Sequence, residues 1–468
     1  MNRPHPTNRL RPKDRPRPTK GTPTVSSPAT PQKRAAIIGT GHRAQMYTKA
    51  LGARAHYDIA LLADPSPSRI AHHNRLLTTL GKPQATACAP DDFAQALRRH
   101  RIDEVVVTTV DATHHTYINT ALEAGCRVVT EKPLTTDAEK CRSILDTVER
   151  TGGELSVGFN YRYNPAHEKI WQLLHDGAIG KIRSVHFEWL LDVRHGADYF
   201  RRWHREKRHS GGLLVHKSGH HFDLVNWWLG AAPTRVHAEG GLVFYGRDNG
   251  ERTGLRRDYV RAHNSPEAAT DPYAIRLADD PNLTSLYLDA EAAGDPYIRD
   301  RNVFGDDIDV EDDLALLVRY DSGATMSYHL TAYSPWEGYR VMFNGTAGRL
   351  ELEVEENTWQ PPRVASGAQG AHGGVVMDRP GRTSILLRPL WEAPREISYE
   401  SAAGSHGGGD LRMLKELFGA VGDGSDEGAV PAAGKGATAR DGALALAVGV
   451  AGNQSLATGL PVETAALF

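Results

Sequence analysis

The sequence predicts an α/β protein with two domains. The first is an N-terminal doubly wound parallel sheet, and the second is a C-terminal α/β domain with a large, mostly antiparallel open sheet. The chain has 468 residues, more than one hydrophobic core usually holds. Strand-like apolar runs alternate with helix-like segments over residues 35–159. After residue 160, long runs of alternating polar and apolar residues replace this pattern, which is typical of antiparallel strands.

The composition excludes several classes of function. The 55 lysine and arginine residues are balanced by 57 aspartate and glutamate residues, so the formal net charge is -2. This balance gives no reason to expect binding to nucleic acid or to an anionic membrane. No apolar run approaches the roughly 18 residues that span a bilayer. Three isolated cysteines, Cys88, Cys126 and Cys141, fit a reducing cytoplasm. We therefore expect a cytoplasmic protein without a nucleic-acid or membrane partner.

Residues 1–34 are predicted to form a disordered tail. The segment is rich in Pro, Arg, Thr and Ser and has almost no large apolar residues. It therefore cannot bury enough surface to offset the entropy lost on ordering. No hydrophobic core follows its basic residues, which argues against a secretory signal. The first domain is expected to span residues 35–159.

A glycine-rich turn follows the first strand of this domain. The apolar run Ala35–Ile38 ends in Gly39-Thr40-Gly41-His42-Arg43-Ala44, and a helix-compatible segment comes next. Gly39 can adopt the dihedral angles of a tight turn, Gly41 lets the backbone approach a pyrophosphate, and Ala44 lets the helix pack closely on the strand. The helix N-terminus offers free N–H groups to phosphates. These six residues are therefore predicted to bind a dinucleotide.

An acidic residue ends the second predicted strand. Ile59–Ala63 reads as a buried strand and is followed by Asp64. Its distance from the glycine turn is close to the spacing of about 20 residues expected for an acid that binds the adenosine ribose hydroxyls. A carboxylate there repels a ribose phosphate, so NAD is favoured over NADP. Arg43 and Arg69 are near enough in the sequence to keep NADP open.

Three further strands are predicted at residues 105–109, 127–130 and 155–159, and the ligands of such a parallel sheet bind beyond the carboxyl ends of its strands. Glu131-Lys132-Pro133 stands at one of these ends. Because proline disfavours the α region for the preceding residue, Lys132 is held extended there. Its ammonium could polarise a substrate hydroxyl or carbonyl, and a nearby nicotinamide cation would lower its pKa toward the range of acid–base catalysis. An ordinary surface lysine before a turn is the alternative.

The second domain is expected to span residues 160–468. A polar insert at residues 246–309 with little periodicity interrupts its strands, and loops of this length are usually functional or mobile. A Gly/Ala-rich surface loop is expected at residues 420–438. The apolar segment 441–452 is expected to form a helix that packs back on the core. The predicted strands lie at residues 182–189, 235–244, 313–320, 324–331, 339–343 and 349–354.

The segment Gly211–Gly230 is predicted to form one helix. His216, His220 and Asp223 would share one face of it, at i, i+3 and i+4 spacing. Asp223 could then fix the tautomer of His220, which would serve as a general base for a substrate hydroxyl. Two alternatives stay open. His216 and His220 have the spacing of metal ligands but lack a glutamate after His216, so we expect no metal, and the histidines could also be satisfied structural residues.

Together these motifs resemble the Gfo/Idh/MocA family, which includes glucose–fructose oxidoreductase and inositol dehydrogenases. The matching segments are Gly39–Ala44, Glu131–Pro133, Asn160–Pro165, Gly211–Gly230 and Val341–Glu351. They cover most of the chain from residue 35 onward, and their order and spacing are far more specific than any single motif. The resemblance implies a Rossmann domain, a bound NAD or NADP, and hydride transfer at a sugar or cyclitol carbon. It also implies a homo-oligomer formed through the open face of the second sheet.

The resemblance also implies roles for single residues. Lys132 matches the catalytic lysine of the family, which often precedes a cis-proline, and His220 and Asp223 match its Asp-x-Gly-x-His-x-x-Asp motif. The chain departs from that motif at His216, where Asp is common, and at Ser218, where Gly is common; this suggests a subgroup with its own substrate. The predicted catalytic residues are Lys132, His220 and His216. The cofactor neighbours beyond the glycine turn and Asp64 are Glu131, Lys132 and Trp203. The predicted substrate ligands are Tyr161, Arg162, Asp192, Arg194, Arg202, His220 and Asp223.

Three functional hypotheses follow. In the leading one, the protein is an NAD-dependent dehydrogenase of a small carbohydrate-like alcohol, and His220, supported by Lys132, removes the hydroxyl proton while the nicotinamide takes the hydride. In the second, it is a glycosidase that oxidises a sugar hydroxyl transiently, cleaves the glycosidic bond by elimination and returns the hydride. In the third, it is a non-catalytic sensor that binds NAD or sugar, against which the two-histidine face argues.

Overall fold

The computed structural model describes residues 1, 32–361, 381–400, 405–421 and 436–467. Most of the predicted tail 1–34 and most of the predicted loop 420–438 therefore lie outside the described residues. At the end of the predicted tail, residues 33 and 34 already belong to the first strand, because that strand begins at Lys33. The first ordered element thus starts two residues earlier than the sequence predicts.

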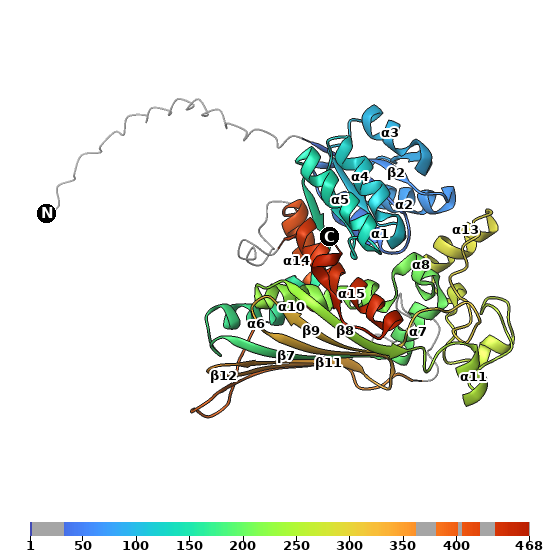
Figure 1. Cartoon of the computed structure of the whole chain (residues 1–468). Helices are drawn as coiled ribbons and strands as arrows, with labels where there is room; N and C mark the ends of the chain where they lie inside the picture. The colour runs from blue at the N-terminus through green and yellow to red at the C-terminus, as the bar shows by residue number, and fades with distance from the viewer. Residues whose placement is uncertain (2–31, 362–380, 401–404, 422–435, 468) are drawn as a thin grey trace. The chain divides into compact units, whose positions relative to one another are not determined.

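The first sheet has seven strands in the order β15-β6-β5-β4-β1-β2-β3 (Figure 1). Neighbours among β1 to β6 pair in parallel, while β15 pairs antiparallel to β6. Its central strands are buried on both faces, as a sheet covered by helices on each side requires. The strands are β1 (Lys33–Ile38), β2 (Tyr57–Ala63), β3 (Thr86–Cys88), β4 (Glu104–Val107), β5 (Arg127–Thr130), β6 (Leu155–Val157) and β15 (Ala437–Thr438).

Helices connect the parallel strands of this sheet. They alternate with the strands along the chain, as the sequence predicts. The hydrophobic core of this domain lies between the helices and the sheet and includes Val105 and Val107 of β4. Asp137 caps one of these helices by accepting a hydrogen bond from the backbone N–H of Lys140. The helices are α1 (Ala44–Gly52), α2 (Pro67–Thr79), α3 (Phe93–Arg99), α4 (His114–Glu123) and α5 (Ala138–Thr151).

The second sheet has nine strands in the order β14-β13-β12-β11-β7-β10-β9-β8-β16. All its pairs are antiparallel except β7 with β10. The fold class predicted from the sequence is therefore confirmed. The strands are β7 (Ile182–Asp192), β8 (Pro233–Gly241), β9 (Asp313–Tyr320), β10 (Thr325–Ser334), β11 (Glu337–Gly345), β12 (Gly348–Asn357), β13 (Arg382–Pro389), β14 (Arg395–Glu396) and β16 (Val462–Glu463).

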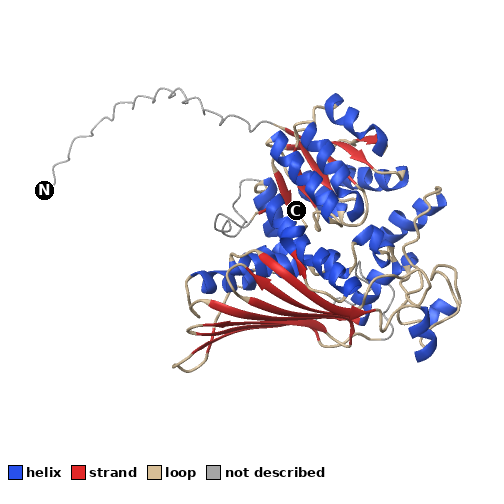
Figure 2. Cartoon of the chain, viewed as in Figure 1, coloured by secondary structure: helices blue, strands red, loops and turns tan. Residues whose placement is uncertain are grey.

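Helices cover one face of the second sheet, as Figure 2 shows. Three of them are α6 (Pro165–His175), α10 (Gly219–Leu229) and α15 (Ala439–Thr458). The last contains the predicted helix 441–452 and contacts β8 of the second sheet as well as α5 and β6 of the first. It therefore links the two sheets through one apolar helix.

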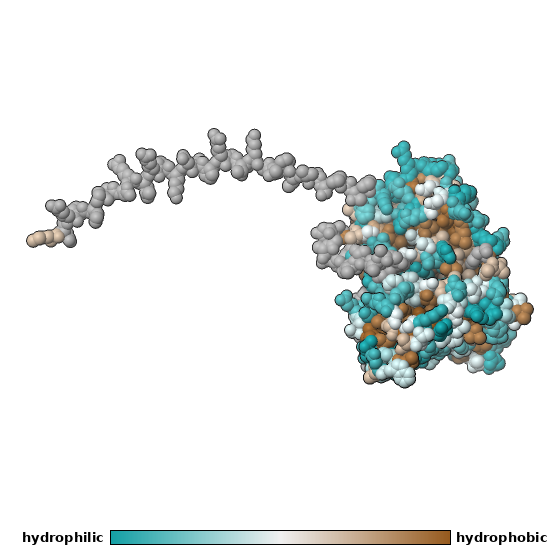
Figure 3. All heavy atoms as spheres, turned by 60° about the vertical axis from the view of Figure 1, so that its left-hand side comes forward, coloured by the Kyte–Doolittle hydropathy of each residue, from teal (hydrophilic) through white to brown (hydrophobic). Residues whose placement is uncertain are grey.

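The opposite face of the second sheet carries the alternate, less buried residues of each strand. On the side of the molecule that Figure 3 displays, hydrophilic and hydrophobic side chains are interspersed. The exposed large hydrophobic residues of the described chain are spread over several elements and include Leu317, Leu411 and Leu460. None of the described helices has the length and apolar character needed to cross a bilayer.

The insert at residues 246–309 contains more structure than the sequence predicts. It holds a series of short helices, among them α11 (Arg247–Thr253), α12 (Pro281–Leu283), the π-helix η7 (Thr284–Leu288) and α13 (Asp289–Ala292). A small apolar cluster that includes Leu283 and Leu286 stabilises it. Short helical turns have too few residues to display a helical period, which explains why the sequence reads as a loop. The insert contacts α2 of the first domain.

Candidate functional site

The glycine turn has the conformation that dinucleotide binding requires. Gly39 has a φ of 87°, and a Cβ there would lie 2.6 Å from the backbone of Thr108, so only glycine fits. A Cβ at Gly41 would have no atom within 4 Å, so the backbone there is open to a ligand. The backbone N–H of Thr40 donates a 2.6 Å hydrogen bond to Oδ2 of Asp64. The turn after β1 and the acid after β2 are thus joined.

One polar atom of this turn still needs a partner. The Thr40 hydroxyl oxygen is buried and makes no hydrogen bond among the described residues. A buried hydroxyl without a partner is costly, and a pyrophosphate oxygen at the adjacent helix N-terminus would accept its hydrogen. The other oxygen of Asp64, Oδ1, accepts a hydrogen bond from the backbone of Ser66 at 2.8 Å. The residues present therefore fit a nicotinamide dinucleotide.

Lys132 lies at the end of β5, before a cis peptide bond to Pro133. Its Nζ donates a 2.9 Å hydrogen bond to the carbonyl oxygen of His216 and lies 3.3 Å from Nε2 of the same residue. Burial lowers the pKa of Lys132 to about 8, although Asp111 acts in the opposite direction. The sequence assigned both Lys132 and His216 to catalysis, and the structure brings them into contact.

His216 ends α9 (Leu213–His216) and also contacts an acid from the first domain. Its Nδ1 lies 2.5 Å from Oδ2 of Asp111, which begins the 3-10 turn η2 (Asp111–Thr113) just beyond β4. We assign the Nδ1 proton to this hydrogen bond, which leaves Nε2 free to accept from Lys132. Burial and the Lys132 charge lower the pKa of His216 well below its ordinary value, so the ring is neutral. Burial also raises the pKa of Asp111.

Two aromatic residues enclose this cluster. Trp203 and His204, in η4 (Trp203–Arg205), stack with their ring centroids 3.5 Å apart. The centroid of His204 lies 4.0 Å from that of His216, and the centroid of Trp203 lies 5.8 Å from it. The apolar faces of these rings exclude water from one side of the Lys132–His216 contact, which strengthens the hydrogen bonds there.

His220 lies on the neighbouring helix α10 against Tyr161. Their rings stack with centroids 4.3 Å apart and planes 9° apart. The buried Lys217 donates a 3.3 Å hydrogen bond to the Tyr161 hydroxyl, and its Nζ lies 4.5 Å above the ring of Trp189. Aromatic faces combined with a few fixed polar groups are typical of sites that bind small molecules.

Comparison with known proteins agrees with this geometry. Residues 33–159 match the family model described as "Oxidoreductase family, NAD-binding Rossmann fold", and residues 172–464 match that described as "Oxidoreductase family, C-terminal alpha/beta domain", both of the Gfo/Idh/MocA family. The chain belongs to the Gfo/Idh/MocA family. It is thus an oxidoreductase with an NAD-binding Rossmann domain, and the resemblance stated from its motifs is confirmed.

Individual relatives place the chain within this family. The YteT protein of Bacillus subtilis (strain 168), which bears the name of an oxidoreductase, is 36% identical over 404 residues, or 82% of this chain and 88% of YteT. An inositol 2-dehydrogenase of Rhizobium meliloti (strain 1021) is 29% identical over 207 residues, or 44% of this chain and 58% of that protein. The crystal structure of an oxidoreductase domain protein from Kribbella flavida shares the fold, with a TM-score of 0.62 and 18% identity over 93% of this chain and 100% of that one.

The family's histidine helix differs here from the prediction. Instead of one helix from Gly211 to Gly230, the structure has α9 and α10, with Lys217 and Ser218 between them. Asp223 does not orient His220. It accepts two hydrogen bonds from Arg162, at 2.8 and 2.6 Å, and burial raises its pKa to about 6 despite that partner. The prediction that Asp223 fixes the tautomer of His220 is therefore wrong.

Other predicted ligands of this Gfo/Idh/MocA chain also make internal contacts. Asp192 caps α7 (Val193–Arg201) with one oxygen and accepts hydrogen bonds from Asn357 and Gln360 with the other, so its acceptor positions are taken. Arg194 donates to the carbonyl oxygen of Pro361. These contacts favour structural roles for both residues, in contrast to the prediction that they bind substrate.

Charged residues near the glycine turn and the cluster are paired as well. Arg202 contacts Asp198 at 2.8 Å. Arg43, predicted to bind cofactor, contacts Glu131 at 2.6 Å and Asp410 at 3.1 Å. No three metal-ligating side chains converge within the described part of the chain.

Asp111 and Lys217 are two residues of the site for which the sequence predicts no individual role. Asp111 stands beyond the strand β4, and carboxyl ends of parallel strands are where ligands bind, so its place was a usable signal. The missing information was its partner, because Asp111 and His216 are separated by 105 positions. Lys217 gave no signal, because a lysine between two motif histidines reads as an exposed side chain.

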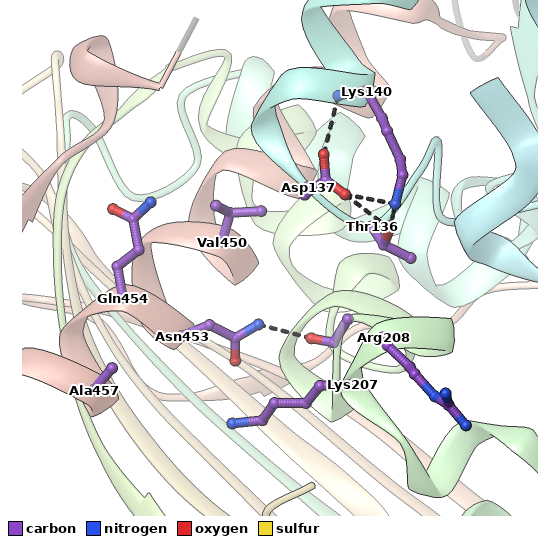
Figure 4. A pocket seen from close by; sticks show the side chains of 10 residues that line it. Thr136, Asp137, Lys140, Lys207, Arg208, Val450, Asn453, Gln454 and Ala457 are labelled. Atoms are coloured by element: carbon purple, nitrogen blue, oxygen red, sulfur yellow. Dashed lines mark hydrogen bonds and ion pairs between the residues drawn. The ribbon is translucent and has the colours of Figure 1, made fainter. Parts of the chain in front are cut away.

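A separate cavity of about 490 Å³ lies between α5, α8 (Lys207–Ser210) and α15, as Figure 4 shows. Lys140, which lines it, is paired with Asp137 at 2.7 Å, and Asn453 donates to the carbonyl oxygen of Gly211. None of the predicted site residues lines this cavity. Its lysines therefore serve as controls for the lysine of the candidate site.

Proposed function

We propose that the protein oxidises a secondary alcohol of a sugar- or cyclitol-like substrate with NAD. The observation that carries this proposal is the half-buried Lys132, whose Nζ contacts His216 while desolvation lowers its pKa to about 8. A lysine with such a pKa at the end of a Rossmann strand suits acid–base chemistry near neutral pH. The similarity to an inositol 2-dehydrogenase supports a cyclitol-like substrate.

The residues that would hold the cofactor are those of the glycine turn, together with Asp64. Gly39 permits the tight turn, Gly41 leaves the backbone accessible, Thr40 offers a buried hydroxyl, and Asp64 offers a carboxylate to the adenosine ribose. When bound there, NAD supplies an acceptor for the hydride that leaves the substrate carbon.

The protein's own residues would handle the proton. At neutral pH Lys132 is mostly an ammonium, because its pKa is about 8, and it can donate a hydrogen bond that stabilises negative charge on the substrate oxygen. His220, held against Tyr161, would accept the hydroxyl proton. Asp111 fixes the ring of His216, and His216 in turn holds the ammonium of Lys132. The stacked rings of Trp203 and His204 would keep water from the reacting oxygen.

A spectroscopic assay tests this proposal. Purified protein is mixed with NAD and a panel of cyclitols and aldoses, and the absorbance of the reduced cofactor is followed. The wild type should reduce NAD with at least one of them, while Lys132→Met and His220→Gln should lose turnover but keep NAD binding. Lys140→Met, in the separate cavity, is the matched control and should behave as the wild type.

Other outcomes would contradict the proposal. Normal rates in both site variants would refute the roles of Lys132 and His220. Cleavage of a chromogenic glycoside with no net reduced cofactor would instead support a glycosidase with transient oxidation. Binding of NAD and sugar without any hydrogen transfer to labelled cofactor would support a sensor.

A further inference from the structure

Arg69 is one of the two arginines that keep NADP open as a cofactor, and the structure shows that its side chain is enclosed. It lies in α2, five positions after Asp64, and its NH1 lies 3.7 Å from Oδ1 of that acid. Its NH2 contacts Oδ2 of Asp295 at 2.6 Å, and its Nε donates to the carbonyl oxygen of Leu286 at 3.3 Å. Asp295 and Leu286 belong to the insert 246–309, so a segment of the second domain holds a cation of the first.

The insert fixes Arg69 from several sides. The guanidinium carbon lies 5.4 Å from the ring centroid of Tyr297 and 5.9 Å from that of Tyr287, within the range of cation–π attraction. Asp295 is itself held, because its Oδ1 accepts a 2.9 Å hydrogen bond from the backbone of Tyr297. The side chains of Arg69 and Asp295 are 15% and 11% exposed, so water screens their pair only weakly. The guanidinium therefore has one orientation.

The adjacent helix surface is tied to the insert in the same way. Arg75 donates to the hydroxyl of Ser285 at 2.7 Å, and Nδ1 of His72 lies 3.0 Å from that oxygen. The polar groups of α2 that face the insert are thus engaged by it.

The contacts of Arg69 affect whether the site can bind the 2′-phosphate of NADP. In dinucleotide-binding folds the acid after the second strand binds the ribose hydroxyls, and a nearby arginine accommodates the 2′-phosphate of NADP. Arginine binds phosphate strongly through paired N–H groups, provided that those groups are not already engaged. Here the charge of one guanidinium is opposed by two carboxylates, Asp64 and Asp295, so these three side chains together carry one net negative charge, which disfavours a phosphate beside them.

We infer that Asp295 makes the cofactor site selective for NAD over NADP by holding the guanidinium of Arg69. The inference rests on the proposed use of a nicotinamide dinucleotide. It assigns a recognition role to the insert, at a residue 226 positions beyond Arg69 in the chain.

Isothermal titration calorimetry of the full chain with NAD and with NADP tests this role. Asp295→Asn keeps the shape of the side chain and the acceptor for the Tyr297 backbone but removes the charge. The variant should bind NADP about tenfold more tightly than the wild type, because a released guanidinium can pair with the phosphate. Its affinity for NAD should change less than about twofold on the same scale, which also shows that the site is folded.

Two further variants separate charge from structure. Arg69→Met combined with Asp295→Asn should lose the gain in NADP affinity, because no guanidinium remains. Glu291→Gln removes a different carboxylate of the insert, one that pairs with Arg261, and should leave both affinities unchanged.

The inference is overturned if Asp295→Asn leaves the ratio of the NAD and NADP affinities unchanged, or if it weakens both equally. A wild-type chain that binds neither dinucleotide would instead overturn the proposed function, and this inference with it.

Discussion

Two buried charged clusters in this protein use similar residues for different ends. In the first, Arg162 contacts Asp223 at 2.6 Å and Asp441 at 3.1 Å, so the cation meets two carboxylates directly. In the second, Lys132 contacts a carbonyl oxygen and a neutral imidazole, and the carboxylate that most raises its pKa, Asp111, contacts the other nitrogen of the His216 ring. The first cluster is closed on itself, whereas the second still has a hydrogen-bond donor to offer.

The pKa values follow this difference. Burial acts to lower the pKa of Arg162, but Asp223 raises it above its ordinary value, so the ion pair is locked. Burial also lowers the pKa of Lys132, and here the more distant carboxylates do not compensate, so it falls to about 8. A match to a family motif therefore does not distinguish a structural residue from a catalytic one, because Arg162 and Asp223 occupy motif positions too. The two clusters differ in whether a carboxylate in direct contact neutralises the charge of the cation, as it does for Arg162 but not for Lys132.

The largest expected effect is on turnover, at Lys132. Replacement by Met removes the only donor that the second cluster offers, and kcat should fall by about 10²- to 10⁴-fold. Steady-state assays of cofactor reduction measure the loss, and calorimetric binding of NAD shows that the fold is intact. If the variant keeps more than half of the wild-type kcat, Lys132 is not catalytic and the two clusters do not differ in function.

The closed cluster should instead respond in stability. Asp223→Asn leaves Arg162 buried with one carboxylate fewer, and breaking a buried pair on one side costs about 3–5 kcal/mol. Urea denaturation measures the free energy of unfolding. The kcat of the folded fraction should stay within a few-fold of the wild type, and a large loss of kcat at unchanged stability would show that Asp223 takes part in chemistry.

A smaller effect is expected at Asp111, which acts on Lys132 through His216. Asp111→Asn should lower kcat by about tenfold, as loss of an outer partner of a site residue usually does. The carboxylate of Asp111 raises the pKa of Lys132, so its removal lowers that pKa further below about 8. If the ammonium is the active form, kcat/KM of the wild type falls as pH rises through about 8, and in the variant this decline moves to lower pH. A decline that stays in place or moves to higher pH contradicts the relay.

The smallest effect serves as the reference for the closed cluster. Arg150 and Glu123 form an ion pair whose side chains are both more than half exposed. Replacing Arg150 by Met should change the free energy of unfolding by less than about 1 kcal/mol, because water screens such a pair. The same urea experiments report it, and a loss as large as that of Asp223→Asn would mean that burial is not what distinguishes the two pairs.

Local features of the fold could be predicted from the sequence, and distant contacts could not. The glycine turn, Asp64 and most strands are encoded in short segments, where period and spacing are visible. Lys132 and His216 were singled out by their motifs, and the structure joins them. Asp111 stands at a strand end, where ligands bind, but its contact with His216 and the contact of Asp295 with Arg69 join residues far apart in the chain, so no local pattern reveals these pairs. The partner of Asp223 was mistaken for the same reason, because a neighbour one helical turn away was visible while Arg162, 61 positions away, was not.

The short strand β15 affects whether the nucleotide-binding half can fold without the rest of the chain. It pairs with β6 through Ala437 and Thr438, and the helix that follows places Gly442 against Leu134 and Val157. A protein truncated after residue 159 would expose both an unpaired sheet edge and the apolar side chains beneath that helix, which promotes aggregation. Synthesis of β15 and α15 is therefore needed to complete the half of the protein that the ribosome makes first.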